Sequence, residues 1–209
     1  MSNATDGEST DDALLGGPGR LVVLSGPSGV GKDTVLRELF RLDPSLRYSV
    51  SYTTRPPRAG EREGVSYSFV DPATFDSMVQ RGDFLEHATV YGQSYGTSLR
   101  RVNDQVSRGD TVVLKIDVQG AERVRRRLGD RALFIFLLPP STEELHRRLQ
   151  ERNTEDQRSL DVREATAVQE LAEQAKYDHA VVNDDVERAA REILGLITAH
   201  ARPGGAVHG

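Results

Sequence analysis

The glycine-rich turn near the start of the chain constrains the fold more than any other feature. It follows Leu21–Leu24 (LVVL), an apolar run that predicts a buried strand. It precedes residues 34–40, whose apolar side chains recur at helical spacing. A glycine turn between a strand and a helix is typical of phosphate binding, because backbone N–H groups and the positive end of the helix dipole face the anion. The chain therefore predicts a phosphate-binding loop in an α/β fold.

This loop, GPSGVGKDT, departs from the common pattern G-x-x-x-x-G-K-[ST] at one position. The last residue of the pattern supplies a hydroxyl to Mg²⁺, and here it is Asp33. Lys32 is retained and is expected to reach the outer phosphates of a nucleotide. The alternative is a glycine turn without a ligand, and the flanking strand and helix argue against it. The residues predicted to bind the phosphates of ATP are Gly26, Pro27, Ser28, Gly29, Val30, Gly31, Lys32, Asp33 and Thr34.

Strand and helix patterns alternate along much of the remaining chain. Continuous apolar runs predict buried strands, and amphipathic runs predict the helices between them. This alternation implies a parallel sheet that is covered by helices on both faces. The predicted strands are residues 111–117, 132–138 and 179–183, and the predicted helices are residues 121–128, 142–152 and 185–200.

Residues 48–97 have a different pattern. Their strands are short and alternate polar with apolar side chains, and one helix interrupts them near residues 73–82. We expect a small mixed β/α lobe inserted into the main sheet. A polar stretch at residues 153–161 is expected to form a mobile loop between helices. The first 18 residues are expected to be a disordered tail, and residues 203–209 a frayed one.

Composition excludes several classes of protein. The 209 residues suggest one domain, and a formal net charge of −5 gives no reason to expect binding to nucleic acid or to an anionic membrane. The absence of cysteine excludes disulfides and thiol catalysis and fits a reducing compartment. No apolar run approaches the roughly 18 residues that a membrane helix needs. The expected location is the cytoplasm.

Four blocks of the sequence, in this order, resemble guanylate kinases over nearly the whole chain. They are SYTTRPPRAGEREGVSYSFV, FLEHATVYGQSYGTS, LKIDVQGA and VVND. The resemblance implies the nucleoside-monophosphate-kinase fold, with a parallel five-stranded core sheet flanked by helices, a GMP-binding lobe and a short lid. It also implies transfer of the γ-phosphoryl group of ATP to GMP or dGMP with Mg²⁺. The implied parts of a domain at 19–209 are the core at 19–47 and 98–202, the lobe at 48–97 and the lid at about 149–166.

The residues of the lobe suit the two features of GMP. Arg55 and Arg58 flank two prolines that stiffen the segment, so their guanidinium groups can hold a dianionic phosphate with less loss of entropy. Guanine presents N–H donors at N1 and N2, and one carboxylate can accept from both, whereas adenine has a lone pair at N1. In the family pattern Glu86 is that carboxylate. The positions implied to bind GMP are Ser51, Arg55, Arg58, Tyr67, Glu86, Tyr95, Thr97 and Asp117, of which Asp117 is expected to orient Arg55 or the GMP region.

The side of the site that binds ATP relies on positive charge around the transferred group. Besides Lys32, the resemblance implies catalytic roles for Arg55 and for three arginines in or beside the lid, Arg148, Arg152 and Arg163. On the residues alone, RRLQER would be a solvated helix face. Asn183, in VVND, matches the position that contacts adenine. The basic run at 123–128 is interpreted as a solvated face rather than a patch for RNA or regulation.

Asp33 has a companion change. Many family members place an acidic residue two positions before the aspartate of the DVQG block, and this chain has Lys115 there. Our hypothesis is a charge swap in which Asp33 pairs with Lys115. Two roles for Asp33 remain open. It can hold Mg²⁺ directly or through water, or Lys115 can neutralise it while the phosphates hold the metal. We expect the ion pair with a water-mediated metal contact.

Two other functions are consistent with parts of the sequence. Guanylate-kinase-like domains that have lost catalysis bind nucleotides or protein partners, but they typically lose the loop and lid residues that this chain keeps. A kinase for a phosphorylated ribose would have no base for Glu86, Ser51 and Thr97 to contact. We expect the partners to be ATP and GMP, with no nucleic acid or membrane, and a monomer or a small homo-oligomer.

Overall fold

The computed structural model describes residues 16–90, 92–152 and 157–200, without the side chains of residues 152 and 157–164. The described residues form two compact units. The first comprises the chain up to Leu21 together with Leu46–Leu114 and Gln119–Ala132, and the second Val22–Ser45, Lys115–Val118 and the chain from Leu133 onward. The predicted tails lie outside the described residues, apart from residues 16–18.

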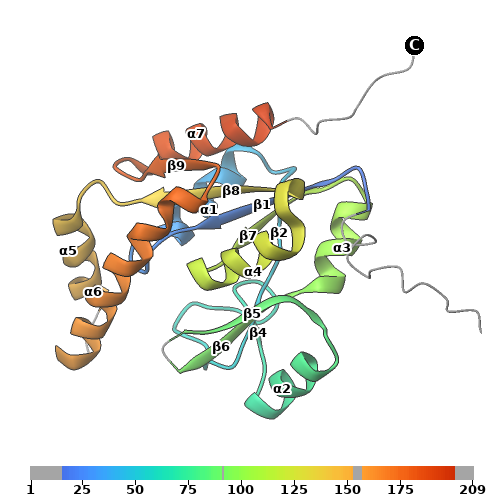
Figure 1. Cartoon of the computed structure of the whole chain (residues 1–209), viewed down its shortest axis with the longest axis horizontal. Helices are drawn as coiled ribbons and strands as arrows, with labels where there is room; N and C mark the ends of the chain where they lie inside the picture. The colour runs from blue at the N-terminus through green and yellow to red at the C-terminus, as the bar shows by residue number, and fades with distance from the viewer. Residues whose placement is uncertain (1–15, 91, 153–156, 201–209) are drawn as a thin grey trace, which may run out of the picture. The chain divides into compact units, whose positions relative to one another are not determined.

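The main sheet has five strands in the order β2-β7-β1-β8-β9 (Figure 1). β2 pairs with β7 and β8 with β9 in parallel. β8 is buried at six of its seven positions, as expected for a strand covered on both faces. The prediction of a parallel five-stranded sheet is confirmed. The strands are β1 Arg20–Ser25, β2 Arg47–Tyr48, β7 Thr111–Lys115, β8 Ala132–Leu138 and β9 His179–Val182.

A second, mixed sheet has the order β4-β3-β6-β5. The helix α2 packs against it through Phe75, whose ring stacks on that of Phe84 at 4.7 Å between centroids. Asp71 caps α2 by accepting the Thr74 N–H at 2.8 Å, and Pro72 occupies the first turn, where its missing N–H costs nothing. The elements are β3 Tyr52–Thr53, β4 Ser68–Phe69, α2 Pro72–Gln80, β5 Phe84–Val90 and β6 Gln93–Ser98.

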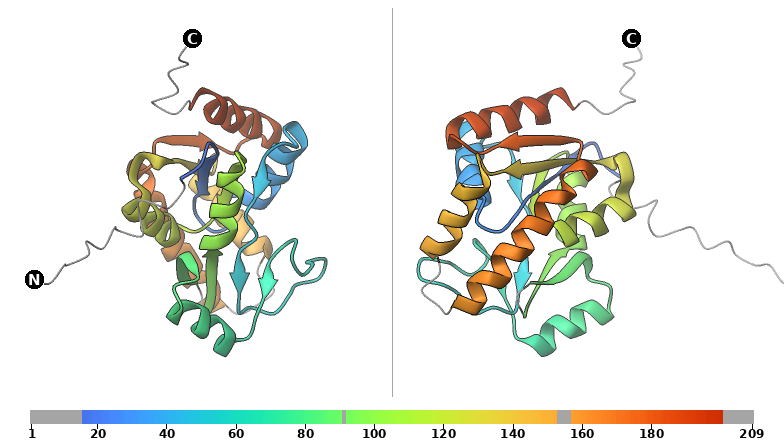
Figure 2. Two further views of the ribbon diagram at one scale, coloured as in Figure 1. Left: turned by 90° about the vertical axis from the view of Figure 1, so that its right-hand side faces the viewer. Right: turned by 60° about the vertical axis from the view of Figure 1, so that its left-hand side comes forward.

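The remaining helices pack largely in pairs. α1 lies beside α7, and α5 lies beside α6 (Figures 1 and 2). Ser141 caps α5 by accepting the Glu144 N–H at 3.1 Å. The helices are α1 Lys32–Leu42, α3 Leu99–Ser107, α4 Val118–Leu128, α5 Thr142–Arg152, α6 Gln157–Ala172 and α7 Val186–Ala199, with short 3₁₀ turns at Gly129–Arg131 and Glu173–Lys176.

Two details differ from the sequence-based expectation. α3 was not predicted, because β6 runs directly into it. Its signals are the cap at Ser98, which accepts the Arg101 N–H, and the buried Val102 and Val106 at helical spacing. The polar stretch 153–161 is not wholly a loop, since α6 begins at Gln157, while residues 153–156 lie outside the described part.

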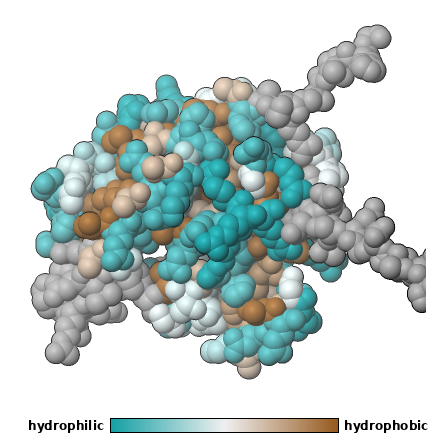
Figure 3. Space-filling model, in the orientation of Figure 1, coloured by the Kyte–Doolittle hydropathy of each residue, from teal (hydrophilic) through white to brown (hydrophobic). Residues whose placement is uncertain are grey.

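The apolar residues gather in the interior, and the face in Figure 3 is largely hydrophilic with scattered hydrophobic patches. Among the described residues, the large hydrophobic side chains that are exposed are Val65, Val168 and Val182. No helix in the described ranges is long and apolar enough to cross a membrane.

Candidate active site

The phosphate loop joins β1 to α1 within the second unit. Gly26 has φ 144°, and a Cβ there would meet the Leu137 carbonyl oxygen at 2.4 Å, so only glycine fits. Gly31 has φ 98° and precedes Lys32, the first residue of α1. Within the described part of the chain, the N–H groups of Gly29, Gly31 and Lys32 donate no hydrogen bond. These N–H groups, at the start of a helix, form a nest for an anion.

Lys32 lies folded against its own loop. Its Nζ donates to the carbonyl oxygens of Gly26 at 2.5 Å and Pro27 at 3.1 Å. Burial lowers the pKa of Lys32, and the carboxylates of Glu170 and Asp117 oppose that change. The ammonium group is therefore placed at the loop, where carboxylates of the same unit partly offset its burial.

The predicted pairing of Asp33 with Lys115 is confirmed. Lys115 Nζ donates to Asp33 Oδ1, and the lysine side chain is only 11% exposed whereas the aspartate is 61% exposed. The Ile116 N–H donates to the Leu24 carbonyl at 3.3 Å, which sets the end of β7 beside the end of β1 where the loop begins. A positive charge on β7 thus meets a negative charge on α1, as the charge-swap hypothesis requires.

Arg148 and Asn183 both contact the loop at the Val30 carbonyl. Asn183 Nδ2 donates to it at 2.8 Å, and Arg148 Nη1 at 3.3 Å. Asn183 is buried, and its Oδ1 has no hydrogen-bond partner among the described residues. Arg148 and Asn183 line a cavity of about 210 Å³, whose other lining residues are Gly29, Gly31, Thr34, Glu151 and Val186.

Glu144 holds Arg148 from one turn earlier on α5. Its Oε1 accepts from Arg148 Nε at 2.7 Å, and Arg147 bonds the same carboxylate. The hydrogen bonds from Arg147 and Arg148 lower the pKa of Glu144 to about 2. Of the other two predicted arginines, Arg152 ends α5 and Arg163 lies within α6, and the structure describes neither side chain.

The predicted phosphate-binding side chains of GMP cluster in the first unit. The Arg55 guanidinium lies 5.4 Å from the ring centroid of Tyr67, which packs edge-on against Tyr95. Burial alone would lower the pKa of Arg55, but hydrogen bonds with Glu61 and Tyr95 outweigh it and raise that pKa. Arg55, Tyr67 and Tyr95 are thus brought together, and Arg58 joins them through its backbone at Glu61.

Glu61 is the acidic partner of this cluster, and sequence reasoning missed it. Its Oε1 accepts from Arg55 Nη2 at 2.7 Å, and its Oε2 accepts the Arg58 N–H at 2.7 Å. Burial alone would raise the pKa of Glu61, but these hydrogen bonds outweigh it and lower that pKa. The carboxylate therefore sets the turn that carries both arginines. The sequence signal that could have identified Glu61 is the presence of a carboxylate three residues after Arg58.

The predicted base-reading residues are all buried. Glu86, 5% exposed, accepts the Thr97 hydroxyl at 2.6 Å, and the two residues face each other across β5 and β6. A bulge interrupts the register between Phe84 and Glu86. Arg127, on α4, donates to the carbonyls of Phe84 and Leu85 at 3.3 Å, so part of the basic run 123–128 supports this bulge rather than facing solvent.

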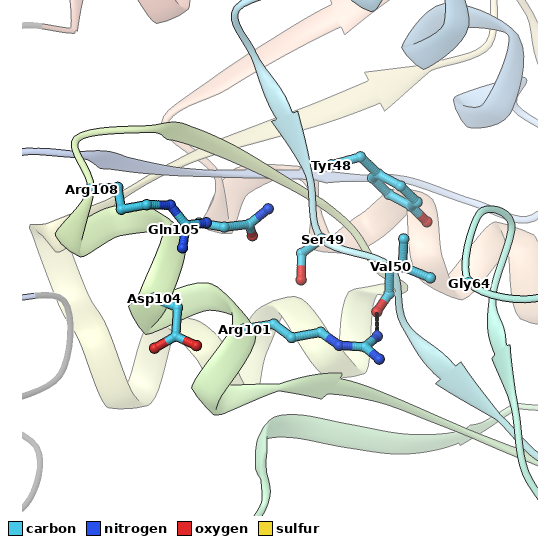
Figure 4. A pocket seen from close by; sticks show the side chains of 8 residues that line it. All are labelled: Tyr48, Ser49, Val50, Gly64, Arg101, Asp104, Gln105 and Arg108. Atoms are coloured by element: carbon cyan, nitrogen blue, oxygen red, sulfur yellow. Dashed lines mark hydrogen bonds between the residues drawn. The ribbon is translucent and has the colours of Figure 1, made fainter.

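Ser51 is held by the segment around it. The Ser68 N–H donates to the Ser51 carbonyl at 2.9 Å. Arg101, on α3, donates to the Val50 carbonyl at 3.2 Å and lies 4.6 Å from the Tyr52 ring centroid. The arginine therefore contacts both neighbours of Ser51. Figure 4 shows Arg101 reaching Val50 beside a cavity of about 290 Å³.

Comparison with known proteins finds relatives in the family that the four sequence blocks resemble. The guanylate kinase family model matches residues 18–200. A guanylate kinase of Alkalilimnicola ehrlichii is 47% identical over 183 residues, covering 88% of this chain and 90% of that protein. A guanylate kinase of Thermobifida fusca is 48% identical and covers 87% and 92%. The crystal structure of guanylate kinase from Anaplasma phagocytophilum superposes with a TM-score of 0.74 at 36% identity, over 87% of this chain and 85% of that one.

Proposed function

Because the chain belongs to the guanylate kinase family, we propose that it transfers the γ-phosphoryl group of ATP to GMP, giving ADP and GDP. dGMP is proposed as a second acceptor. The observation that carries this proposal is the buried Glu86 carboxylate, hydrogen-bonded to Thr97 in the same unit as the Arg55 cluster. A buried carboxylate suits guanine because it accepts from N1–H and N2–H together, and it opposes adenine, whose N1 is an acceptor.

The acceptor phosphate is proposed to bind Arg55, Arg58, Tyr67 and Tyr95. Their existing contacts support this, because Arg55 already lies against Tyr67 and bonds to an anion, the Glu61 carboxylate. Arginine forks bind phosphate and carboxylate in the same bidentate way. Ser51 and Thr97 are proposed to complete the base pocket. Asp117 remains a proposed orienting residue.

The phosphates of ATP are proposed to bind the loop from Gly26 to Thr34. The N–H groups of Gly29, Gly31 and Lys32, which donate to no acceptor among the described residues, supply donors. Lys32 would leave its carbonyl partners to reach the phosphates. Asn183 and the cavity beside it are the proposed place for adenine. Arg148, Arg152 and Arg163 are proposed to surround the γ-phosphate, as the resemblance implies.

Transfer then needs alignment and charge rather than a general base. An oxygen of the GMP phosphate is already anionic, and it attacks the γ-phosphorus while the bond to the β–γ bridging oxygen breaks. The bridging oxygen leaves on ADP. Lys32 and the arginines stabilise the charge on the moving group, and exclusion of water by the lid would limit hydrolysis of ATP.

Mg²⁺ is proposed as the cofactor that accompanies ATP. Among the described residues, no three acidic or histidine side chains are grouped to hold a metal, which suits an ion carried mainly by phosphates. The exposed Asp33 carboxylate is a hard oxygen ligand at the end of the loop, and it would hold the ion directly or through water. When bound, Mg²⁺ neutralises charge on the phosphates. Lys115 keeps the local charge of the protein near that of relatives that lack both changes.

We also propose a physiological setting. Purine nucleotide metabolism, including recycling of GMP, follows from the substrates, and the cysteine-free composition is in keeping with the cytoplasm. We propose a monomer or a small homo-oligomer without nucleic-acid or membrane partners.

The test is production of ADP by the purified chain with ATP and Mg²⁺, comparing GMP with AMP, CMP, UMP and a ribose bisphosphate. We expect turnover with GMP and dGMP and none above background with the others. The Lys32→Met variant serves as the inactive control. Calorimetric binding of GMP without any ADP formation would contradict the proposal and identify a nucleotide-binding module instead.

A further inference from the structure

A residue of α6 that is distant in the sequence contacts the phosphate loop. Glu170 lies on α6, and its Oε2 accepts the Ser28 N–H at 3.1 Å across 142 positions of sequence. Ser28 stands in the middle of the loop, between the two glycines Gly26 and Gly29. Its backbone N–H is held by a group from another element, Glu170, and no motif in the sequence predicts this contact.

The same carboxylate acts on Lys32. Burial raises the pKa of Glu170, and the Lys32 ammonium and the Ser28 N–H oppose that rise, while Asp117 adds to it. Among the carboxylates that raise the pKa of Lys32, Glu170 contributes the most. Lys32 in turn donates to the carbonyls of Gly26 and Pro27, which precede Ser28. The Glu170 carboxylate therefore bonds the backbone of the loop at Ser28 and also acts to raise the pKa of Lys32.

α6 is fixed on another side by α5. Ala167, 2% exposed, packs with Leu145 and Leu149 of α5, and Leu171 joins the same cluster. Position 163 lies seven residues before Glu170, which is two turns of helix, so the two positions share one face of α6. The helix that carries Arg163 is thus joined to the loop that is proposed to bind the phosphates of ATP.

We propose that Glu170 is a positioning residue of the donor site, which fixes the phosphate loop at Ser28 and ties α6 to it. This inference rests on the proposed function, since it assigns the loop to ATP. The carboxylate uses Ser28 and leaves the N–H groups of Gly29, Gly31 and Lys32 unbonded within the described chain. Glu170 therefore fixes the loop without occupying the N–H groups that are proposed to bind phosphate. A gate, in contrast, would occupy those groups and compete with phosphate.

The test compares Glu170→Ala and Glu170→Gln with the matched control Glu173→Gln, whose side chain bonds Lys176 one turn further on. Steady-state kinetics give KM for ATP and for GMP, and calorimetry gives the affinity for ADP without turnover. We expect Glu170→Ala to raise KM for ATP about tenfold and to weaken ADP binding similarly, with KM for GMP within twofold. Glu170→Gln keeps an acceptor for the Ser28 N–H and should recover most of that loss, to within about threefold of the wild type.

Three results would overturn the proposal. Tighter binding of ADP by Glu170→Ala would identify a gate, unchanged KM for ATP would leave the contact without a role, and equal rises in both KM values would show general destabilisation. If Glu170→Ala fails to fold, the ADP affinity of Glu170→Gln is measured instead. A gate predicts that this variant binds ADP more tightly than the wild type does. Positioning predicts binding that is equal to or weaker than that of the wild type. Wild-type turnover of GMP in the same assay tests the proposed function separately.

Discussion

The proposed donor and acceptor regions offer different kinds of chemical group to their ligands. The donor region offers backbone N–H groups of a glycine loop, and the side chains around it, Lys32 and Glu170, have pKa values displaced by burial. The acceptor region offers side chains, the forks and rings of Arg55, Tyr67 and Tyr95, set by a carboxylate at Glu61. This contrast indicates where specificity can reside. A backbone nest recognises any phosphate, whereas under the proposed function the choice of base depends on Glu86 and its hydroxyl partner.

The largest effect is expected at Glu86. Glu86→Gln replaces one acceptor oxygen by a donor that faces the guanine N–H groups, so kcat/KM for GMP should fall about a hundredfold, in line with roughly 1–3 kcal/mol per bidentate base contact. KM for ATP should stay within twofold. Kinetics with GMP measure the loss, and turnover of AMP is followed in parallel. Glu122→Gln, on the surface of α4, is the matched control, and an unchanged kcat/KM for GMP in Glu86→Gln would show that Glu86 does not select the base.

The charge pair at the edge of the donor site should have the next largest effect. Asp33→Ser removes the carboxylate that the nearly buried Lys115 bonds, and Lys115→Asp brings two carboxylates together. Each single variant should therefore lose about tenfold in kcat, or about 1.4 kcal/mol. The double variant should recover to within threefold of the wild type. A double-mutant cycle of kcat at saturating Mg²⁺ measures the coupling. Additive losses would show that the two residues act independently.

The acceptor region offers a smaller test at Arg101. Arg101→Ala removes the donor to the Val50 carbonyl and the contact with Tyr52, so the backbone at Ser51 should loosen and KM for GMP should rise about threefold to fivefold. Arg100, exposed on the same helix, provides the control variant Arg100→Ala. KM for ATP is measured alongside, and an effect on that constant alone would contradict the assignment.

The smallest effect is on stability and concerns pH. The raised pKa of Glu170 means that the folded protein holds this proton more tightly than the unfolded chain does. Its contribution to the free energy of unfolding is therefore full below the ordinary pKa of 4.5 and is lost as pH rises through the folded value. Lys32, which opposes the rise in the pKa of Glu170, and Asp117, which adds to it, are the charged groups that act on this carboxyl.

Glu170→Gln cannot titrate, so its Tm relative to wild type should increase by about one to two degrees from pH 4 to pH 7. Thermal unfolding of both proteins across that range measures the difference. A Tm difference that decreases with pH would mean that the folded carboxylate is stabilised in its charged form. The glutamine variant should thus avoid this loss of stability at neutral pH while remaining the less efficient enzyme.

The sequence predicts the layout of the fold well where patterns are strong. The buried run 132–138 and the capped helix 142–152 have the predicted bounds, because continuous apolar residues, a proline pair and a cap mark them plainly. α3 is missed because its start is the end of a strand. The pairing of Lys115 with Asp33 was predictable because strand ends in a parallel sheet meet at the loop.

The supporting residues could not be predicted in the same way. Glu170 and Arg101 act through backbone groups far away in sequence, and a helix carries many exposed glutamates and arginines with no such contact. Arg127 was interpreted as part of a solvated face, although it bonds the carbonyls at the β5 bulge. These side chains differ from other charged residues of their helices only in the folded structure, where they reach backbone groups that are distant in sequence.

A crossed binding experiment tests the division between donor and acceptor sites most directly. Titration calorimetry of ADP and of GMP, each into the wild type, Glu86→Gln and Glu170→Ala, gives six affinities under one condition. We predict that Glu86→Gln weakens GMP alone and that Glu170→Ala weakens ADP alone. If either variant weakens both ligands equally, the division into a backbone-built donor site and a side-chain-built acceptor site is wrong.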